Sequence, residues 1–230
     1  MSLNELKKDM RSFADPERAV NSQRFFKTGK GDYGEGDVFI GIRVPDIRKV
    51  AKKYKELSVP EISELVSSPI HDERTCALII MTLRYPGDKD IFYKLYLDNT
   101  QYINNWDLVD VTCPRIVGDY LLDKPHDVLY KLANSNDLWE KRIAIISTLM
   151  FIRAGEYDDT LKLSEILLTD SHDLIHKAVG WALREVGNKS KETETDFLKK
   201  HYKTMPRTML RYAIEKFPEP ERKKYLNGEI

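Results

Sequence analysis

The stretch at residues 104–117, NNWDLVDVTCPRIV, shows the pattern that decides the fold. Placed on a helix at about 100° per residue, this stretch and its continuation give one apolar stripe, formed by Trp106, Val109, Cys113, Ile116, Val117 and Tyr120. Asp110 falls inside that stripe, one turn after Trp106. A carboxylate that loses water on an apolar face costs free energy unless something compensates. The stretch therefore predicts an amphipathic helix that carries one misplaced acid.

The same helical periodicity recurs from about residue 45 to the C-terminus, with almost no strand-like alternation. Similar helix starts occur at residues 71, 105, 136, 171 and 205, at intervals of 34, 31, 35 and 34, and a second helix lies between successive starts. The tetratricopeptide unit has this length, but its Trp-Leu-Gly-Tyr signature is missing. We therefore expect an all-α protein, a right-handed α-solenoid of HEAT-like two-helix repeats.

The 230 residues are expected to form a single HEAT-like repeat domain. Residues 1–44 would be an N-terminal helical cap with a Gly-rich loop, with helices near 3–13 and 16–27, and residues 45–230 would be the repeats. The loop GKGDYGEGD at 29–37 contains G-x-G-x-x-G, but it follows a helix and no βαβ unit surrounds it. This context favours a flexible turn over a dinucleotide site. Pro45 is expected near the first position of the next helix.

Composition excludes few partners. Thirty-seven Lys and Arg balance thirty-seven Asp and Glu, so a nucleic-acid partner would require cations gathered on one surface. The start MSLNELKKDM has no apolar signal-peptide core, and no apolar run approaches the ~18 residues of a membrane span. We expect a cytoplasmic protein without membrane contact. Cys76 and Cys113 lie in apolar helical patterns and are expected to be core thiols.

Two further residues depart from their helix faces. Arg142 shares a face with apolar residues and stands 32 residues after Asp110, in a nearly equivalent place of the next repeat. Such a pair could form a structural ion pair, and the same guanidinium would also suit phosphate. Trp181 points away from the core stripe of its helix, as do Leu174, Lys177, Ala178, Arg184 and Glu185. An indole off the core between cations is typical of an interaction site, although burial under a neighbouring helix is the alternative.

Cations gather near these positions. Lys177 and Arg184 accompany Trp181, and a short basic edge follows in HYKTMPRTMLRYAIEKF, made of Lys203, Arg207 and Arg211. Such charges usually form only a solvated face, but beside an aromatic cleft they indicate contacts to backbone phosphates. We predict that Trp106, Asp110, Arg142 and Trp181 converge on one concave, solvent-open groove.

Four motifs in this order, NNWDLVD, LWEKRIAI with FIRAGE, DLIHKAVGWALREVG and MPRTMLRYAIEKFPE, resemble the AlkD-type DNA alkylation repair glycosylases, which are built from HEAT-like repeats. The resemblance runs from about residue 38 to the C-terminus. It implies that Asp110 is the catalytic carboxylate and that Trp106 and Trp181 lie against the backbone and sugar of the lesion nucleotide. It implies a place near the scissile bond for Arg142. Pro114, four residues after Asp110, must kink this helix or begin a new one.

The resemblance implies a monofunctional DNA glycosylase that removes cationic N3- or N7-alkylated purines, such as 3-methyladenine and 7-methylguanine, from duplex DNA in base excision repair. The damaged base would not enter a deep pocket, and bulky adducts could be accepted. Such a base leaves without a general acid, so no cofactor or metal is expected. The five His residues lack the spacing and company of zinc ligands, and no Lys is evidently placed for a Schiff base.

Two other functions remain open from the residues. One is a non-catalytic relative that binds distorted or branched DNA, which predicts salt-sensitive binding without base release. The other is a helical-repeat scaffold for a protein partner, which predicts negligible affinity for DNA. The sequence carries no clear oligomerisation signal, so a monomer is expected.

Overall fold

The computed structural model describes residues 1–230 as an all-α protein without a β-strand, apart from one isolated parallel bridge between Val38 and Ile70. The chain divides into two compact units, Met1–Thr112 and Cys113–Ile230. The boundary falls at the end of α7, next to Pro114. No helix is long and apolar enough to cross a membrane.

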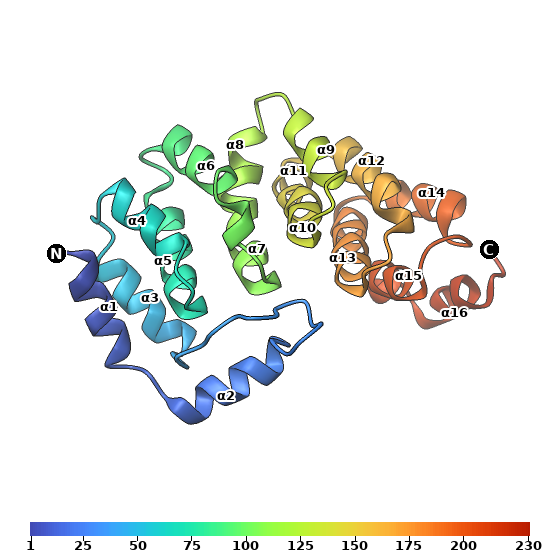
Figure 1. Ribbon diagram of the computed structural model, residues 1–230. Coiled ribbons are helices and arrows are strands. Elements are labelled where there is room, and N and C mark those ends of the chain that lie inside the picture. The colour runs from blue at the N-terminus through green and yellow to red at the C-terminus, as the bar shows by residue number, and fades with distance from the viewer. The chain divides into compact units, whose positions relative to one another are not determined.

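The first unit begins with two N-terminal helices, and the second of them is followed by a loop that runs back alongside it (Figure 1). Its elements are α1 (Leu3–Arg11), α2 (Pro16–Phe25), α3 (Val44–Lys53), α4 (Val59–Val66), α5 (His71–Arg84), α6 (Lys89–Leu97), the 3-10 turn η1 (Thr100–Tyr102) and α7 (Trp106–Cys113). Both expected N-terminal helices are present, and Pro45 lies in the first turn of α3 as predicted. The glycine loop is irregular, as expected, and Gly31 and Gly36 adopt the left-handed conformation with φ of +83°.

Helix α5 organises the core of the first unit because it packs against both α3 and α4. Its side chains Leu78, Ile80 and Met81 are at most 1% exposed, and Ile62 and Leu65 of α4 are fully buried beneath them. Asp72 ties the preceding loop to α5, since its two carboxylate oxygens accept the backbone N–H groups of Ile40 and Ile42 at 2.9 and 2.8 Å. This tie closes the loop over the start of α5.

The second unit begins with a π-helical turn, η2 (Pro114–Gly118). Its other elements are α8 (Asp119–Leu121), α9 (Asp127–Ala133), α10 (Leu138–Ser147), α11 (Leu149–Ala154), α12 (Asp158–Ile166), η3 (Leu167–Thr169), α13 (Asp173–Lys189), α14 (Lys191–His201), α15 (Arg207–Ala213), η4 (Ile214–Lys216) and α16 (Glu219–Asn227). Helix α13 is central, with α10, α12, α14 and α15 packed against it. Gly180 permits the approach of α15, because a Cβ there would lie 2.5 Å from the carbonyl oxygen of Met209.

The predicted repeat starts are confirmed as helix starts. The helices α5, α7, α10, α13 and α15 begin within two residues of the expected positions, at His71, Trp106, Leu138, Asp173 and Arg207. The expected second helices are also present, for example α9 and α12. Cys76 and Cys113 are both fully buried, and burial raises the pKa of the Cys76 thiol to about 12. Both are therefore core thiols, as expected.

Candidate functional site

Helix α7 brings Trp106 and Asp110 together on successive turns. The backbone N–H of Trp106, the first residue of the helix, donates to the side-chain oxygen of the buried Asn105 at 2.9 Å. Leu108 and Val109 point into the core at 1% and 0% exposure, whereas Trp106 and Asp110 are only half-buried. The Asp110 carboxylate is therefore neither sealed in the core nor fully solvated, which is where a carboxylate exerts a strong field on a nearby cation.

Pro114 ends the α-helical pattern immediately after this site. It has no N–H, so the Asp110 carbonyl four residues earlier does not receive its usual helix hydrogen bond. The chain passes from α7 into the π-turn η2 at this residue. The predicted interruption of the helix is confirmed, and it lies one turn beyond the carboxylate.

Aromatic side chains from the end of α2 surround the Trp106 indole. Its ring lies 5.8 Å from Phe25 in an edge-to-face contact and 5.4 Å from Phe26. Phe25 is nevertheless 65% exposed, an unusual condition for a phenyl ring. Sequence reasoning missed Phe25, because α2 carries no apolar stripe that would distinguish an exposed ring from a core ring.

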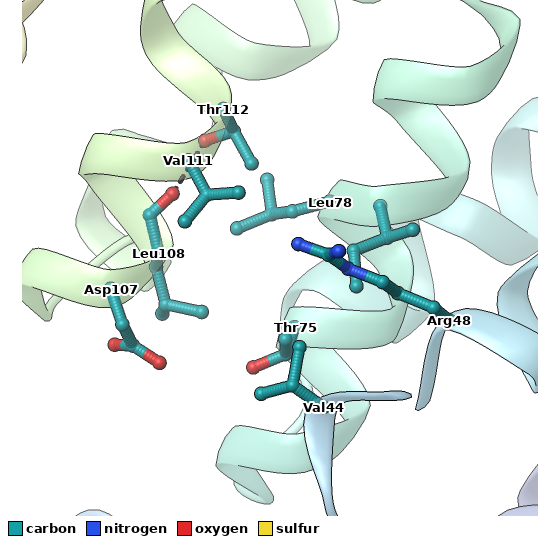
Figure 2. A pocket seen from close by; sticks show the side chains of 9 residues that line it. Val44, Arg48, Thr75, Leu78, Asp107, Leu108, Val111 and Thr112 are labelled. Atoms are coloured by element: carbon teal, nitrogen blue, oxygen red, sulfur yellow. Dashed lines mark hydrogen bonds between the residues drawn. The ribbon is translucent and has the colours of Figure 1, made fainter. Parts of the chain in front are cut away.

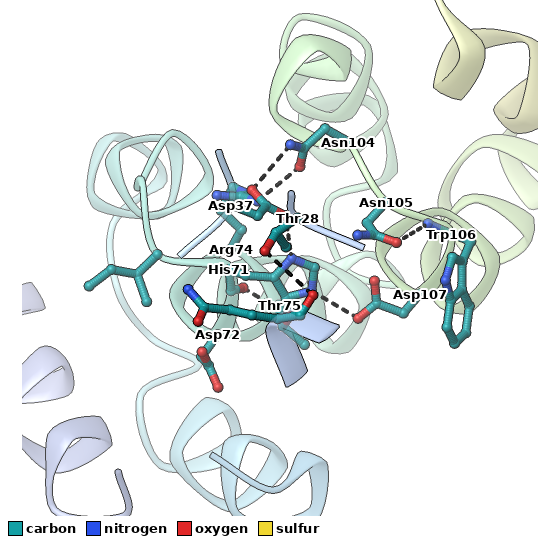
Figure 3. Close-up of polar contacts among 12 residues, drawn as sticks. Thr28, Asp37, His71, Asp72, Arg74, Thr75, Asn104, Asn105, Trp106 and Asp107 are labelled. Carbon is teal, nitrogen blue, oxygen red and sulfur yellow. Dashed lines mark hydrogen bonds and ion pairs between the residues drawn. The ribbon is translucent and has the colours of Figure 1, made fainter. Parts of the chain in front are cut away.

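A chain of buried charges leads to the first turn of α7 (Figure 3). Asp107 accepts from His71 Nε2 at 2.9 Å, and the other ring nitrogen of His71 lies 2.9 Å from Asp37. Asp37 also accepts from Arg74 at 2.5 Å, and Asn104 donates to the same oxygen of Asp37 at 3.2 Å. Two acids and two basic groups thus balance one another inside the first unit.

The charge chain sets the protonation of its members. Burial alone lowers the pKa of His71, but the hydrogen bonds to Asp107 and Asp37 outweigh it and raise that pKa above its ordinary value. For Asp37, burial favours the neutral acid, yet His71 and Arg74 hold its pKa below the usual range. Both shifts favour an imidazolium that is paired with carboxylates. Neither His71 nor Asp107 was among the expected site residues.

Two hollows border this charge chain. One, of about 400 Å³, is lined by Phe26, Phe39, His71 and Asp107, with α3 residues on its other wall. The other is small and mostly apolar (Figure 2). In it, Asp107, Leu108 and Val111 of α7 face α3 and α5 residues. No group of three or more His, Cys, Asp or Glu side chains in residues 1–230 could hold a metal ion.

Arg142 lies in the second unit, on the apolar face of α10 where the sequence placed it. It is 5% exposed, and one of its terminal nitrogens donates to the Leu174 carbonyl at 2.6 Å. That carbonyl belongs to the first turn of α13, so Arg142 links these two helices. The predicted position of Arg142 on the apolar face of its helix is therefore confirmed.

Trp181 is half-buried on α13, and its indole N–H donates to Glu185 at 3.1 Å. The predicted core stripe of this helix is confirmed, since the following residues are all fully buried: Ile175, Val179, Ala182, Leu183 and Val186. The expectation for Ala178 was wrong, because it is fully buried instead of sharing an open face with Trp181. The reason is that α13 packs on several neighbours, which widens its buried face.

The expected DNA-binding cations fall into two groups. Those on α13 are engaged by acids: Lys177 pairs with Asp173 at 2.7 Å, and Arg184 with Glu215. The cations of the basic edge are exposed, namely Lys203, Arg207 and Arg211. One terminal nitrogen of Arg207 donates to the Leu226 carbonyl at 2.5 Å.

The structure thus assembles the expected site residues into two sets. Trp106 and Asp110 belong to the first unit, and Arg142, Trp181 and the cations belong to the second. Both residues of the first set lie on α7. In the second set, Lys203 lies in the turn after α14, and the other residues lie on α10, α13 and α15. The meeting of the two sets in one groove stays a prediction.

A family model described as DNA alkylation repair enzyme matches residues 6–217. The chain belongs to this family of DNA alkylation repair enzymes. A solved structure described as a predicted DNA alkylation repair enzyme from Enterococcus faecalis has a TM-score of 0.70 at 16% identity, over 90% of this chain and 97% of that chain. At this identity the likeness is one of fold. No curated protein matches the chain.

Proposed function

We propose that this DNA alkylation repair family member is a monofunctional DNA glycosylase, which hydrolyses the N-glycosidic bond of cationic N3- or N7-alkylated purines in duplex DNA. The observation that carries the proposal is the half-buried Asp110 one turn after the Trp106 indole on α7. The resemblance in sequence gives these two positions the roles of catalytic carboxylate and lesion-contacting aromatic. Their partial burial is compatible with both roles.

The chemistry needs only a fixed anion. An alkylated purine that already carries a positive charge leaves without protonation. As the bond to it stretches, positive charge develops on the deoxyribose, as in glycoside cleavage. The Asp110 carboxylate would stabilise this charge and orient the attacking water, and its partial burial strengthens the field on the sugar. Indole faces add cation–π attraction of about 0.5–2 kcal/mol each.

The second unit would supply the rest of the site. We place Trp181 against the sugar and backbone of the lesion nucleotide and Arg142 near the scissile bond. The backbone phosphates would be held by cations, which are Lys177, Arg184, Lys203, Arg207 and Arg211. This proposal includes a single HEAT-like solenoid whose concave face holds the four central residues, and a monomer as the active form. For Lys177 and Arg184, phosphate would replace the present acidic partners.

The test is the fate of methylated duplex DNA. We expect the purified full chain to release 7-methylguanine and 3-methyladenine while the strand stays intact until alkali cleaves the abasic sites. Release of neither base overturns the proposal. Salt-sensitive binding without release would instead assign the chain to non-catalytic binding of distorted DNA, and negligible binding would indicate a scaffold.

A further inference from the structure

The first turn of α7 contacts a histidine, His71, whose two ring nitrogens must both donate hydrogen bonds. His71 is 2% exposed at the start of α5, and both of its ring nitrogens lie 2.9 Å from carboxylate oxygens. Carboxylates accept and do not donate, so both contacts are hydrogen bonds only when both nitrogens carry a proton. A neutral imidazole has one N–H and would leave one of the two carboxylates, Asp37 or Asp107, facing a lone pair.

Asp107 depends on this contact. Its second carboxylate oxygen is buried without a hydrogen-bond partner, so His71 is what compensates its burial. Asp37 has more hydrogen-bond donors, because Arg74 and Asn104 also donate to it. Loss of the His71 proton would therefore be felt most at Asp107, in the first turn of α7.

We propose that His71 and Asp107 are positioning residues for the candidate site. The doubly donating His71 fixes the first turn of α7 and so fixes the direction of the Trp106 indole and of the Asp110 carboxylate one turn later. The inference rests on the proposed function in one respect, that Asp110 is the catalytic carboxylate.

Charged groups from three elements around His71 shift the pKa of its imidazole. The loop before α3 contributes Asp37, α7 contributes Asp107, and both anions favour the imidazolium. Arg74 of α5 is a cation and disfavours the protonated imidazole. The rings of Phe26 and Phe39 stack on the imidazole, with centroids 5.3 and 4.3 Å away, and exclude water. The anions prevail, so the His71 proton is lost only above the ordinary histidine range.

The first test does not involve activity. In nitrogen NMR of the full chain, we expect protons on both ring nitrogens of His71 at neutral pH. The Trp106 indole resonance should titrate with the same midpoint as His71, and Asp107→Asn should lower that midpoint. His71→Gln should abolish the titration of Trp106. A Trp106 resonance that ignores the state of His71 would overturn the inference.

A matched control exists in the second unit. His126 also uses both ring nitrogens, with Asp159 at 2.7 Å and the Leu121 carbonyl at 2.8 Å, and it stacks on Phe151. All three of these partners belong to the second unit, so His126→Gln should leave the Trp106 titration and the reaction rate unchanged.

The second test is the rate of base release at saturating protein, with every variant checked by circular dichroism to be folded. We expect His71→Gln to slow single-turnover release roughly tenfold or more, because small misplacements of a catalytic group are costly, with DNA affinity within about twofold of wild type. The wild-type rate should fall as pH rises through the His71 pKa, and the variant should show no such fall. A variant with the wild-type rate and pH profile refutes positioning. If the wild type releases no base, the proposed function fails, and the NMR titration alone decides the inference.

Discussion

Glu194 is a buried acid whose charge the fold disfavours, and its replacement by Gln should change how stability depends on pH. The side chain lies on α14 at 1% exposure, and its Oε1 is buried without a hydrogen-bond partner. Its Oε2 packs so closely on Gly187 that a Cβ there would overlap it. Burial raises the pKa of Glu194 to about 8, although Lys191 and Arg184 act in the opposite direction.

The size of the effect follows from proton linkage. In the unfolded chain the carboxyl returns to its ordinary pKa of 4.5, compared with about 8 when folded. Between these values the folded state keeps a proton that the unfolded state has released, so the free energy of unfolding falls as pH rises. The fall is about 1.4 kcal/mol per pH unit, or roughly 4–5 kcal/mol over the window. Below pH 4.5 the stabilisation is complete, and above about pH 8 it is lost.

The assay is urea unfolding of the full chain at several pH values from about 5.5 to 8.5, followed by circular dichroism. We expect the free energy of unfolding of Glu194→Gln, measured relative to wild type, to rise with pH, because Gln cannot ionise. Glu192 lies on the same helix but is exposed, so Glu192→Gln should follow wild type at every pH. Parallel pH profiles for wild type and Glu194→Gln would refute the reasoning.

Three further predictions concern packing and DNA. Gly180→Ala should lower the free energy of unfolding, measured with urea, by roughly 1–3 kcal/mol through overpacking. Gly87→Ala should change it little, because a Cβ there would lie no closer than 3.5 Å to any neighbouring atom. Equal effects of the two substitutions would contradict the packing argument. Phe25→Ala should weaken binding to an abasic-site duplex by about 1–3 kcal/mol in fluorescence anisotropy with little loss of stability, and unchanged affinity would exclude the ring from the interface. Replacing the three cations of the basic edge, Lys203, Arg207 and Arg211, by Gln should reduce the slope of log affinity against log salt concentration by about 0.9 for each phosphate that the protein no longer neutralises. An unchanged slope would show that these three residues do not contact DNA phosphates.

Much of the fold could be predicted because its signals are local. Capping residues and the 3.6-residue period indicate helix starts without knowledge of any partner, and the five expected starts lie within two residues of observed helix starts. Arg142 and Trp181 were also recognised as residues that depart from their helix faces. The burial of Ala178 was not foreseen, since one helix's periodicity does not tell how many neighbours will cover it.

The missed residues depend on contacts between distant parts of the chain. His71 meets Asp37 and Asp107 across 34 and 36 residues of sequence, so no spacing rule connects them. Glu194 lies in the polar stretch KETETDFLKK and resembles a solvated acid until α13 covers it. Both cases are charges whose burial is decided by tertiary packing, which a helical period cannot report.

The most direct test of the central claim compares wild type with Asp110→Asn on a duplex that contains a single 7-methylguanine. Single-turnover excision at saturating protein and the equilibrium affinity for the same duplex are measured together. Because the carboxylate acts on charge that develops only in the transition state, we predict an affinity within about twofold of wild type and excision slower by roughly a hundredfold or more. Excision by Asp110→Asn at the wild-type rate would contradict the account.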